Sequence, residues 1–351
     1  MRPCAVVKKT FKWWCVFGLV SVRDGIWRNP RQSYLRPLPA RLGVSACGRS
    51  RRLDRVLTHF GSDHSFAAAG VQEHYGFEIG VSAVRNATLE HAQRARTRLQ
   101  TEYAQPFRVL PAAGKEHVIA QADGTMICTV EPGMKKGKRP RQWKEMRLVA
   151  AQARDSATTV YGVTFGSVAE TGLRWGHCTR QAGWGLNSRI HAVGDGADWI
   201  RLQSREIFGD QGNYLCDYFH VSEYLGAAAI ICRPAQPDQW RRTQQKRLKR
   251  GAVRKVLASL EEHLEAAGTP EAEAPVRNAH RYLSNRLDCL DYPKALALGL
   301  PIGSGMIESG HRHVLQARLK KAGAAWLSNH ADQIAHLRVL KANNQWLSLW
   351  N

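Results

Sequence analysis

The chain has 351 residues, 44% of them hydrophobic and 8% aromatic, which is enough apolar material for two or three globular domains. Its 51 Lys and Arg against 29 Asp and Glu leave a formal net charge of +22, which indicates a polyanionic partner. The eight cysteines are scattered, and no stretch approaches the about 20 apolar residues that span a bilayer. We therefore expect no zinc site, no membrane contact, and a cytoplasmic, nucleoid-associated protein.

Residues 1–60 form a basic segment in which thirteen Lys or Arg stand against Asp24 and Asp54. The apolar stretch Trp13 to Val22, followed by Arg23-Asp24-Gly25, predicts a hairpin whose return strand is Ile26 to Trp27. We expect this hairpin and arm to lie on DNA. The alternative is a solvated basic arm with little structure.

Residues 61–107 predict two helices about a short turn, the first from Ser65 and the second N-capped by Ser82. The arrangement resembles a helix-turn-helix DNA-binding region, although paired short helices also occur in unrelated proteins. The residues that it would turn toward a DNA groove are Arg85, Asn86 and Thr88.

The middle of the chain alternates between strands and helices in an informative order. We expect strands over residues 118–130, 146–154, 158–165, 189–193 and 214–216. We expect helices over residues 167–182, 197–207 and 220–231. Three strands, helix, strand, helix, strand, helix is the order of an RNase H-like fold, an α/β fold with a mixed sheet and flanking helices.

Residues 233–298 interrupt this series with charged helical sequence, which we interpret as an all-helical insertion. A turn at Pro301 to Gly305 then leads into a helix over 306–321, and Trp326 with a last helix over 330–343 completes the core. The predicted domains are 1–60, 61–107, an RNase H-like domain of 108–232 with 299–351, and the insertion 233–298.

Three acids occupy special places in this order. Asp123 lies within the first strand, Asp195 ends the fourth, and Glu308 lies in the helix after the insertion; these places meet in an RNase H-like sheet. An apolar strand has no structural use for Asp123, because a buried carboxylate is costly unless it is paired or metal-bound. Taken singly, each acid has an ordinary explanation as a turn residue or a helix-start charge. Asp198 competes with Asp195 as the second ligand.

The stretches Q-A-D-G-T, H-A-V-G-D-G-A-D-W-I, D-Y-F-H-V-S-E-Y-L and P-I-G-S-G-M-I-E-S-G-H-R-H-V resemble those of Mutator-like bacterial insertion-sequence transposases. This resemblance implies that Asp123, Asp195 and Glu308 form a DDE catalytic triad. Such a triad holds two divalent cations, Mg²⁺ or Mn²⁺, which suit carboxylate oxygens and phosphodiester chemistry. It also makes Asp217 and His220 a D-x-x-H element, in which His220 either touches DNA near the cut or caps the sheet edge.

Basic side chains near these acids are candidates for DNA contact. His311 and Arg312 follow Glu308 by one helical turn and flank the metal face. Four basic side chains on this helix or at its end are expected to contact the DNA backbone: Arg312, Arg318, Lys320 and Lys321. The alternative is that they form a solvated helix end. Lys135 and Lys136, between the first two strands, either follow phosphates or belong to a flexible basic loop.

These features predict a DNA transposase that performs metal-dependent hydrolysis and strand transfer at insertion-sequence ends. Its partners would be double-stranded DNA, as terminal inverted repeats and as target, and at least one further copy of itself, because two ends must be joined. The alternatives are a catalytically inactive DNA-binding remnant or regulator, and a nuclease of RNase H type that cuts without joining.

Overall fold

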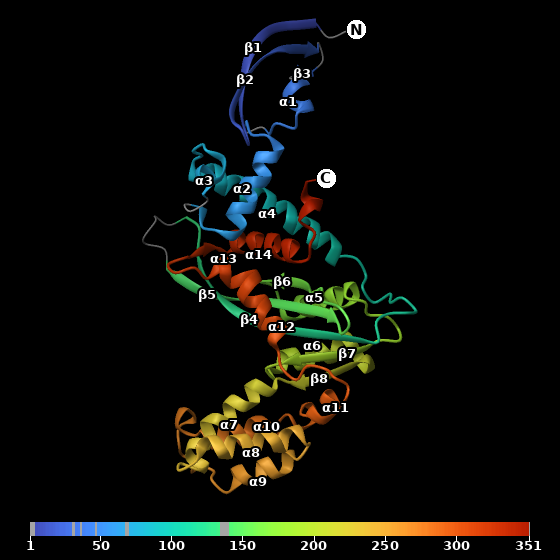
Figure 1. Ribbon diagram of the computed structural model, residues 1–351, viewed down its shortest axis with the longest axis vertical. Coiled ribbons are helices and arrows are strands. Elements are labelled where there is room, and N and C mark those ends of the chain that lie inside the picture. Colours follow the sequence, from blue (N-terminus) through green and yellow to red (C-terminus); the bar gives the residue numbers. More distant parts are fainter. Residues whose placement is uncertain are drawn as a thin grey trace. The chain divides into compact units, whose positions relative to one another are not determined.

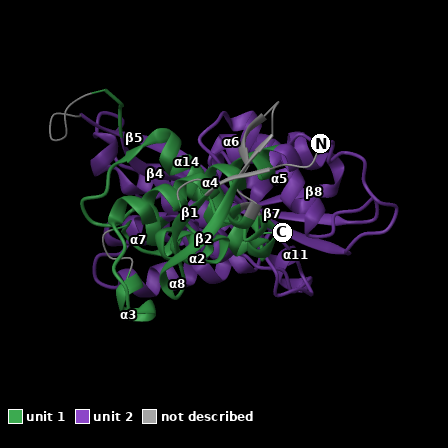
Figure 2. Ribbon diagram, turned by 90° about the horizontal axis from the view of Figure 1, so that it is seen from above, with its two compact units in different colours: residues 1–100, 130–139, 316–351 green, residues 101–129, 140–315 purple. Residues whose placement is uncertain are grey.

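The computed structural model describes residues 4–29, 32–35, 37–45, 48–66, 70–133 and 140–350. The chain forms two compact units, each assembled from separate stretches of sequence (Figure 2). Unit 1 comprises residues 1–100, 130–139 and 316–351, and unit 2 comprises residues 101–129 and 140–315. The C-terminal residues 316–351, which the sequence analysis grouped with the RNase H-like domain, thus belong to the unit that holds the N-terminus.

Unit 1 begins with an antiparallel hairpin of β1 (Cys4–Cys15) and β2 (Gly18–Asn29), which β3 (Gln32–Leu35) extends before α1 (Pro37–Arg41). The predicted turn at Arg23-Asp24-Gly25 is wrong, because the strands reverse at Val16-Phe17 and Cys15 pairs with Gly18. Gly18 closes this short loop with a φ of +98°, which favours glycine. Asp24 instead lies within β2, opposite Lys9.

Unit 1 continues with α2 (Arg51–Asp63), α3 (Val71–Tyr75) and most of α4 (Val81–Tyr103) (Figure 1). The predicted arm ending at residue 60 is corrected, because α2 starts at the N-cap Ser50, and Leu53 and Leu57 are fully buried. Their i, i+4 spacing places both on one helical face despite the surrounding arginines. The two helices about a turn are confirmed as α3 and α4, but Ser82 lies inside α4 and does not cap it.

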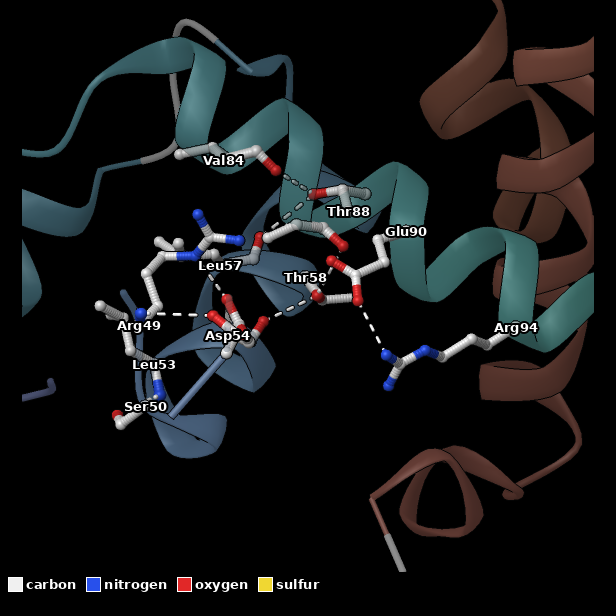
Figure 3. A network of polar contacts seen from close by, with 12 residues as sticks. Arg49, Ser50, Leu53, Asp54, Leu57, Thr58, Val84, Thr88, Glu90 and Arg94 are labelled. Atoms are coloured by element: carbon white, nitrogen blue, oxygen red, sulfur yellow. Dashed lines mark hydrogen bonds and ion pairs between the residues drawn. The ribbon is translucent and has the colours of Figure 1, made fainter. Parts of the chain in front are cut away.

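A polar network joins α2 to α4 (Figure 3). Arg49 donates from Nε to Asp54 Oδ1 at 2.5 Å, and both side chains are buried. Burial raises the pKa of Asp54, and the hydrogen bond from Arg49 opposes that shift. Thr88, expected to face DNA, is also buried: its Oγ1 donates to Val84 O at 2.7 Å and packs against α2. The helices therefore meet through small and polar groups as well as apolar ones.

Unit 2 contains a mixed α/β layer built on β4 (His117–Val130), β5 (Arg141–Ala153), β6 (Val160–Thr164), β7 (Arg189–Gly194) and β8 (Gly212–Cys216). The strand order is β6-β5-β4-β7-β8; β5 and β6 are antiparallel, and β4, β7 and β8 are parallel. The helices between and after the strands are α5 (Val168–Gln181), α6 (Asp198–Phe208) and α7 (Tyr218–Cys232). These elements confirm the predicted order, although β4 runs through Gly124 without interruption.

The predicted helical character of residues 233–298, the proposed insertion, is confirmed by α8 (Pro237–Lys249), α9 (Val253–Glu261), α10 (Pro275–Ser284) and α11 (Tyr292–Ala297). Its apolar side chains share one core with β8 and α7, so the insertion packs on the sheet domain through common side chains. After it come α12 (Gly305–Gly310), a π-helical turn (His311–Gln316) and α13 (Ala317–Leu319). The chain ends in β9 (Trp326–Leu327) and α14 (Ser328–Ala342), and Trp326 is buried as predicted.

The remaining composition-based expectations concern thiols and membranes. Among the cysteines whose side chains the structure describes, five are free and buried: Cys128, Cys178, Cys216, Cys232 and Cys289. In the part of the chain that the structure describes, no helix combines the length and apolar character needed to cross a bilayer.

The close approach of α2 and α4 predicts the effect of adding one methyl group. A Cβ at Gly61 would lie 1.9 Å from Thr88 Oγ1, whereas a Cβ at Gly80 would meet nothing within 4 Å. We expect Gly61→Ala to lower the free energy of unfolding by about 1–3 kcal/mol, as overpacking does. Gly80→Ala, the matched control, should change it by less than about 0.5 kcal/mol. Urea titration followed by circular dichroism measures both, and equal values would disprove the close helix contact.

Candidate functional site

The three predicted acids line one cavity in unit 2. This cavity of about 260 Å³ is bordered by Asp123, Asp195 and Glu308, together with Asp217, His220 and Glu223. Asp198, the competing second acid, is absent from the lining; it starts α6 with its side chain 76% exposed. The structure thus brings together the three acids that the sequence analysis selected and leaves the competitor outside.

Parallel strand register explains why two of these acids meet. β4 and β7 pair in parallel with Gln121 opposite Val193, and Asp123 and Asp195 each lie two residues beyond that pair. On the next strand, Gly194 pairs with Cys216, and Asp217 N donates to Gly194 O at 2.7 Å. Three aspartates therefore follow one another across neighbouring parallel strands, at the edge where ligands bind in open α/β sheets.

Asp123 is held by groups on two elements. Its Oδ1 accepts from the backbone N–H of Gly124 at 2.7 Å, and its Oδ2 lies 3.2 Å from His311 Nε2. The His311 side chain is only 4% exposed, whereas that of Asp123 is 40% exposed. His311 belongs to the π-helical turn, and such turns re-aim side chains that a regular helix would direct elsewhere. The expectation that His311 flanks the acids is confirmed by this contact.

Three hydrogen bonds fix the loop that carries Asp195. Its Oδ1 accepts from Ala197 N at 2.8 Å. From α10 of the insertion, Tyr282 Oη donates to Asp195 O at 2.6 Å. Arg286 Nε donates to the next carbonyl, Gly196 O, at 2.8 Å. The insertion consequently positions the second acid, a role that charged helical sequence alone did not reveal.

Glu308 is placed by two side chains from the sheet. Gln121, on β4, donates from Nε2 to Gly303 O at 3.1 Å and accepts from Ile307 N at 2.8 Å. Ser304 donates from Oγ to Glu308 Oε1 at 3.1 Å. The start of α12 is therefore hydrogen-bonded to the same strand that carries Asp123.

Asp217 completes this arrangement from the start of α7. Its carboxylate is buried, with 2% of the residue exposed. Oδ1 accepts from Phe219 N at 2.6 Å as an N-cap, and Oδ2 accepts from Ser304 N at 3.0 Å and from Ser304 Oγ. A buried carboxylate is stable only with such donors. Asp217 therefore acts on the site by joining α7 to α12.

His220 follows one turn into α7 and lines the cavity. Its Nδ1 lies 3.5 Å from Glu223, and its ring packs edge-on against Tyr224 and Tyr282 at 5.4 and 5.8 Å. His220 therefore lies at the same cavity as the three acids. Contact with DNA remains a prediction.

The donor set of the cavity suits a hard divalent cation. Asp123, Asp195 and Glu308 offer carboxylate oxygens, which Mg²⁺ and Mn²⁺ prefer. Among the described residues, however, no three His, Cys, Asp or Glu side chains already stand in a metal-binding arrangement. Each of the three carboxylates contacts a protein group: Gly124 N and His311, Ala197 N, or Ser304 Oγ.

The polar and basic residues expected on DNA fall into three groups. Exposed ones are Arg85 and Asn86 on α4, and Arg312, Lys320 and Lys321 on or after the helix of Glu308. Lys135 and Lys136 lie outside the described residues. Arg318 is the correction, because it is only 3% exposed.

Arg318 is buried as a structural cation in unit 1. Its guanidinium lies 4.7 Å from the ring centroids of both Phe66 and Trp326, and its Nε donates to Gly61 O at 3.0 Å. Burial, followed by the charge of Arg338, lowers the pKa of Arg318 to about 10. The π-helical turn before it breaks the regular spacing from which its outward direction was predicted.

Comparison with known proteins gives one partial match. A family model described as "Uncharacterised protein family (UPF0236)" matches residues 186–348. No curated protein and no solved structure matches the chain. The matched stretch includes Asp195, Asp217 and Glu308 and leaves out Asp123.

The Asp217–Ser304 contact predicts a loss of stability on removal of one hydroxyl. The single hydroxyl hydrogen of Ser304 is shared between Asp217 Oδ2, the nearer acceptor, and Glu308 Oε1. We expect Ser304→Ala, which removes this donor, to lower the free energy of unfolding by about 1.5–3 kcal/mol, as for hydrogen bonds to charged groups. Ser309→Ala, at an exposed position in the same helix, is the matched control and should be neutral. Thermal unfolding measures the difference, and equal midpoints would contradict the role of Ser304.

Substitution of the buried Arg318 and of the exposed Arg312 is predicted to affect stability to different extents. Arg318→Ala should lower the free energy of unfolding by about 2–4 kcal/mol, because it removes ring contacts and a buried hydrogen bond. Arg312→Ala, at an exposed position, should leave stability within about 0.5 kcal/mol. Urea unfolding distinguishes them. If Arg318→Ala left the free energy of unfolding unchanged, the buried position of Arg318 would be contradicted.

Proposed function

We propose that this chain is a DNA transposase with an RNase H-like core that cleaves and joins DNA at the ends of an insertion sequence. The observation that carries the proposal is the meeting of Asp123, Asp195 and Glu308 in one cavity, from β4, the end of β7 and α12. The strand order β6-β5-β4-β7-β8, with one antiparallel side and three parallel strands, supports the RNase H-like assignment.

The chemistry follows from the donor set. Two Mg²⁺ or Mn²⁺ ions bound by these carboxylates would stabilise the charge on the attacking and leaving oxygens of a phosphodiester. The chain's own residues orient this site: His311 packs beside Asp123, Tyr282 and Arg286 hold the Asp195 loop, and Gln121 with Ser304 holds the start of α12. Water is the nucleophile for cleavage, and the freed 3′-hydroxyl is the nucleophile for joining.

DNA as substrate is supported by charge. The surplus of +22 favours a polyanion, and Arg312, Lys320 and Lys321 are exposed beyond Glu308 along the chain. Arg85 and Asn86 on α4 are exposed candidates for contact with the inverted repeats, and His220 lines the cavity of the acids. Joining two ends calls for at least a dimer on DNA, in the nucleoid of the cytoplasm.

A second candidate is a catalytically inactive DNA-binding remnant or regulator. The observation that favours it is that all three carboxylates are already hydrogen-bonded or ion-paired with protein groups. Such pairing would have to rearrange before the oxygens could serve as ligands.

Strand transfer with matched acid variants tests the proposal. Purified protein, labelled element ends, target plasmid and Mg²⁺ should yield joined products. Asp195→Asn should reduce joining by more than about 100-fold, since loss of even an outer partner of a metal ligand costs about 10–100-fold. Asp198→Asn, the neighbouring exposed acid, should retain activity.

The other outcomes identify the rivals. Binding without cleavage would support the inactive regulator, and cleavage without joining would support a nuclease. Full activity in Asp123→Asn, Asp195→Asn and Glu308→Gln proteins would remove these acids from the mechanism.

A further inference from the structure

Unit 1 contains a second cavity, which the acids do not border. It measures about 450 Å³ and lies among α2, α3 and the residues after α14. The side chains that define it are Arg52, Arg55, Phe60, His74, Tyr75 and Trp346, and we refer to it as the Trp346 pocket. Its size is that of a site for a small organic group.

Aromatic rings form much of the wall of the Trp346 pocket. Phe60 and His74 lie with ring centroids 5.3 Å apart and an interplanar angle of 35°, and His59 meets Trp346 edge-on at 5.8 Å. Tyr75 is 37% exposed, and Phe60 and Trp346 are half-buried. These rings therefore retain surface toward the cavity, where a flat ligand could stack.

The charge of the pocket is positive. Arg52 and Arg55 line it, no Asp or Glu does, and neither arginine has an ion-pair partner among the described residues. Asp63, one turn beyond His59, is already engaged by Arg338 at 2.8 Å and by Lys341. Burial, followed by the charge of Lys341, lowers the pKa of His59, so its ring is neutral near pH 7.

We propose that the Trp346 pocket binds an unpaired nucleotide of DNA, with the base against the aromatic rings and its phosphate on Arg52 and Arg55. Stacking surfaces beside arginines are the features that bind single-stranded nucleic acid without sequence preference. Inside a duplex both faces of each base are covered by its neighbours, and at a blunt end only the outer face of a paired base is open, so an unpaired or extruded base is the form that can enter between these rings. This inference rests on the proposed function for DNA as the substrate, and it adds the form of DNA that unit 1 selects.

Binding to two matched DNA molecules tests the pocket. The full-length protein is titrated, in EDTA to prevent cleavage, with a labelled blunt duplex and with the same duplex carrying a single-stranded overhang. We expect the overhang DNA to bind on the order of tenfold more tightly, as one stacked base provides. Tyr75→Leu should abolish this preference and leave affinity for the blunt duplex unchanged, whereas Tyr75→Phe, which keeps the ring, should retain it.

The control is an exposed tryptophan elsewhere. Trp143 is 63% exposed on β5, and Trp143→Leu should keep the preference for the overhang. Equal affinity of the unmodified protein for the two DNA molecules would overturn the proposal, as would a preference that survives Tyr75→Leu. The two proposals can fail separately. If only the transposase proposal is wrong, the unmodified protein gives no joined products and still prefers the overhang DNA.

Discussion

The geometry of the acid cavity depends on the hydrogen bonds that the buried carboxylate of Asp217 accepts. This carboxylate lies at the end of the parallel strands, caps α7 and accepts two hydrogen bonds from Ser304 at the start of α12. A charge so far from solvent must keep these donors, because an unsatisfied buried carboxylate costs several kcal/mol. The starts of α7 and α12 are consequently fixed together. Gln121 adds the link to β4, so Glu308 is held in register with the strand that carries Asp123.

The helical insertion also helps to fix the geometry of the acid cavity. Tyr282 of α10 and Arg286, just after this helix, bond to the carbonyls of Asp195 and Gly196, and the insertion shares its apolar core with β8 and α7. Gly196 takes a φ of +85°, and a side chain there would collide with Tyr282 and Arg286. The loop that carries the second acid is therefore shaped from two sides. Changes within the insertion would reach the cavity through this contact.

The basic surplus of the chain is divided between structure and surface. Arg49 pairs with Asp54, Arg338 and Lys341 pair with Asp63, and Arg318 lies between two rings. These cations hold unit 1 together and are poorly placed to neutralise phosphates. The exposed ones, among them Arg312, Lys320 and Arg52, are available to a polyanion. A count of Lys and Arg consequently overstates the charge offered to DNA.

The sequence by itself determined the order of the strands and helices in unit 2, since that order depends on local periodicity. It also indicated that Asp123, Asp195 and Glu308 would lie together, from their places within a strand, at a strand end and in a late helix. It also determined the insertion, which has helical pattern and high charge. Only the tertiary structure decided the direction of Arg318, which follows a π-helical turn, and the burial of Thr88, which lies at a close helix contact. It also decided the turn at Val16-Phe17, which depends on the register of the two strands. The grouping of residues 316–351 with the N-terminus, and the hold of Tyr282 on Asp195, have the same origin: residues far apart in the chain meet only once the chain has folded.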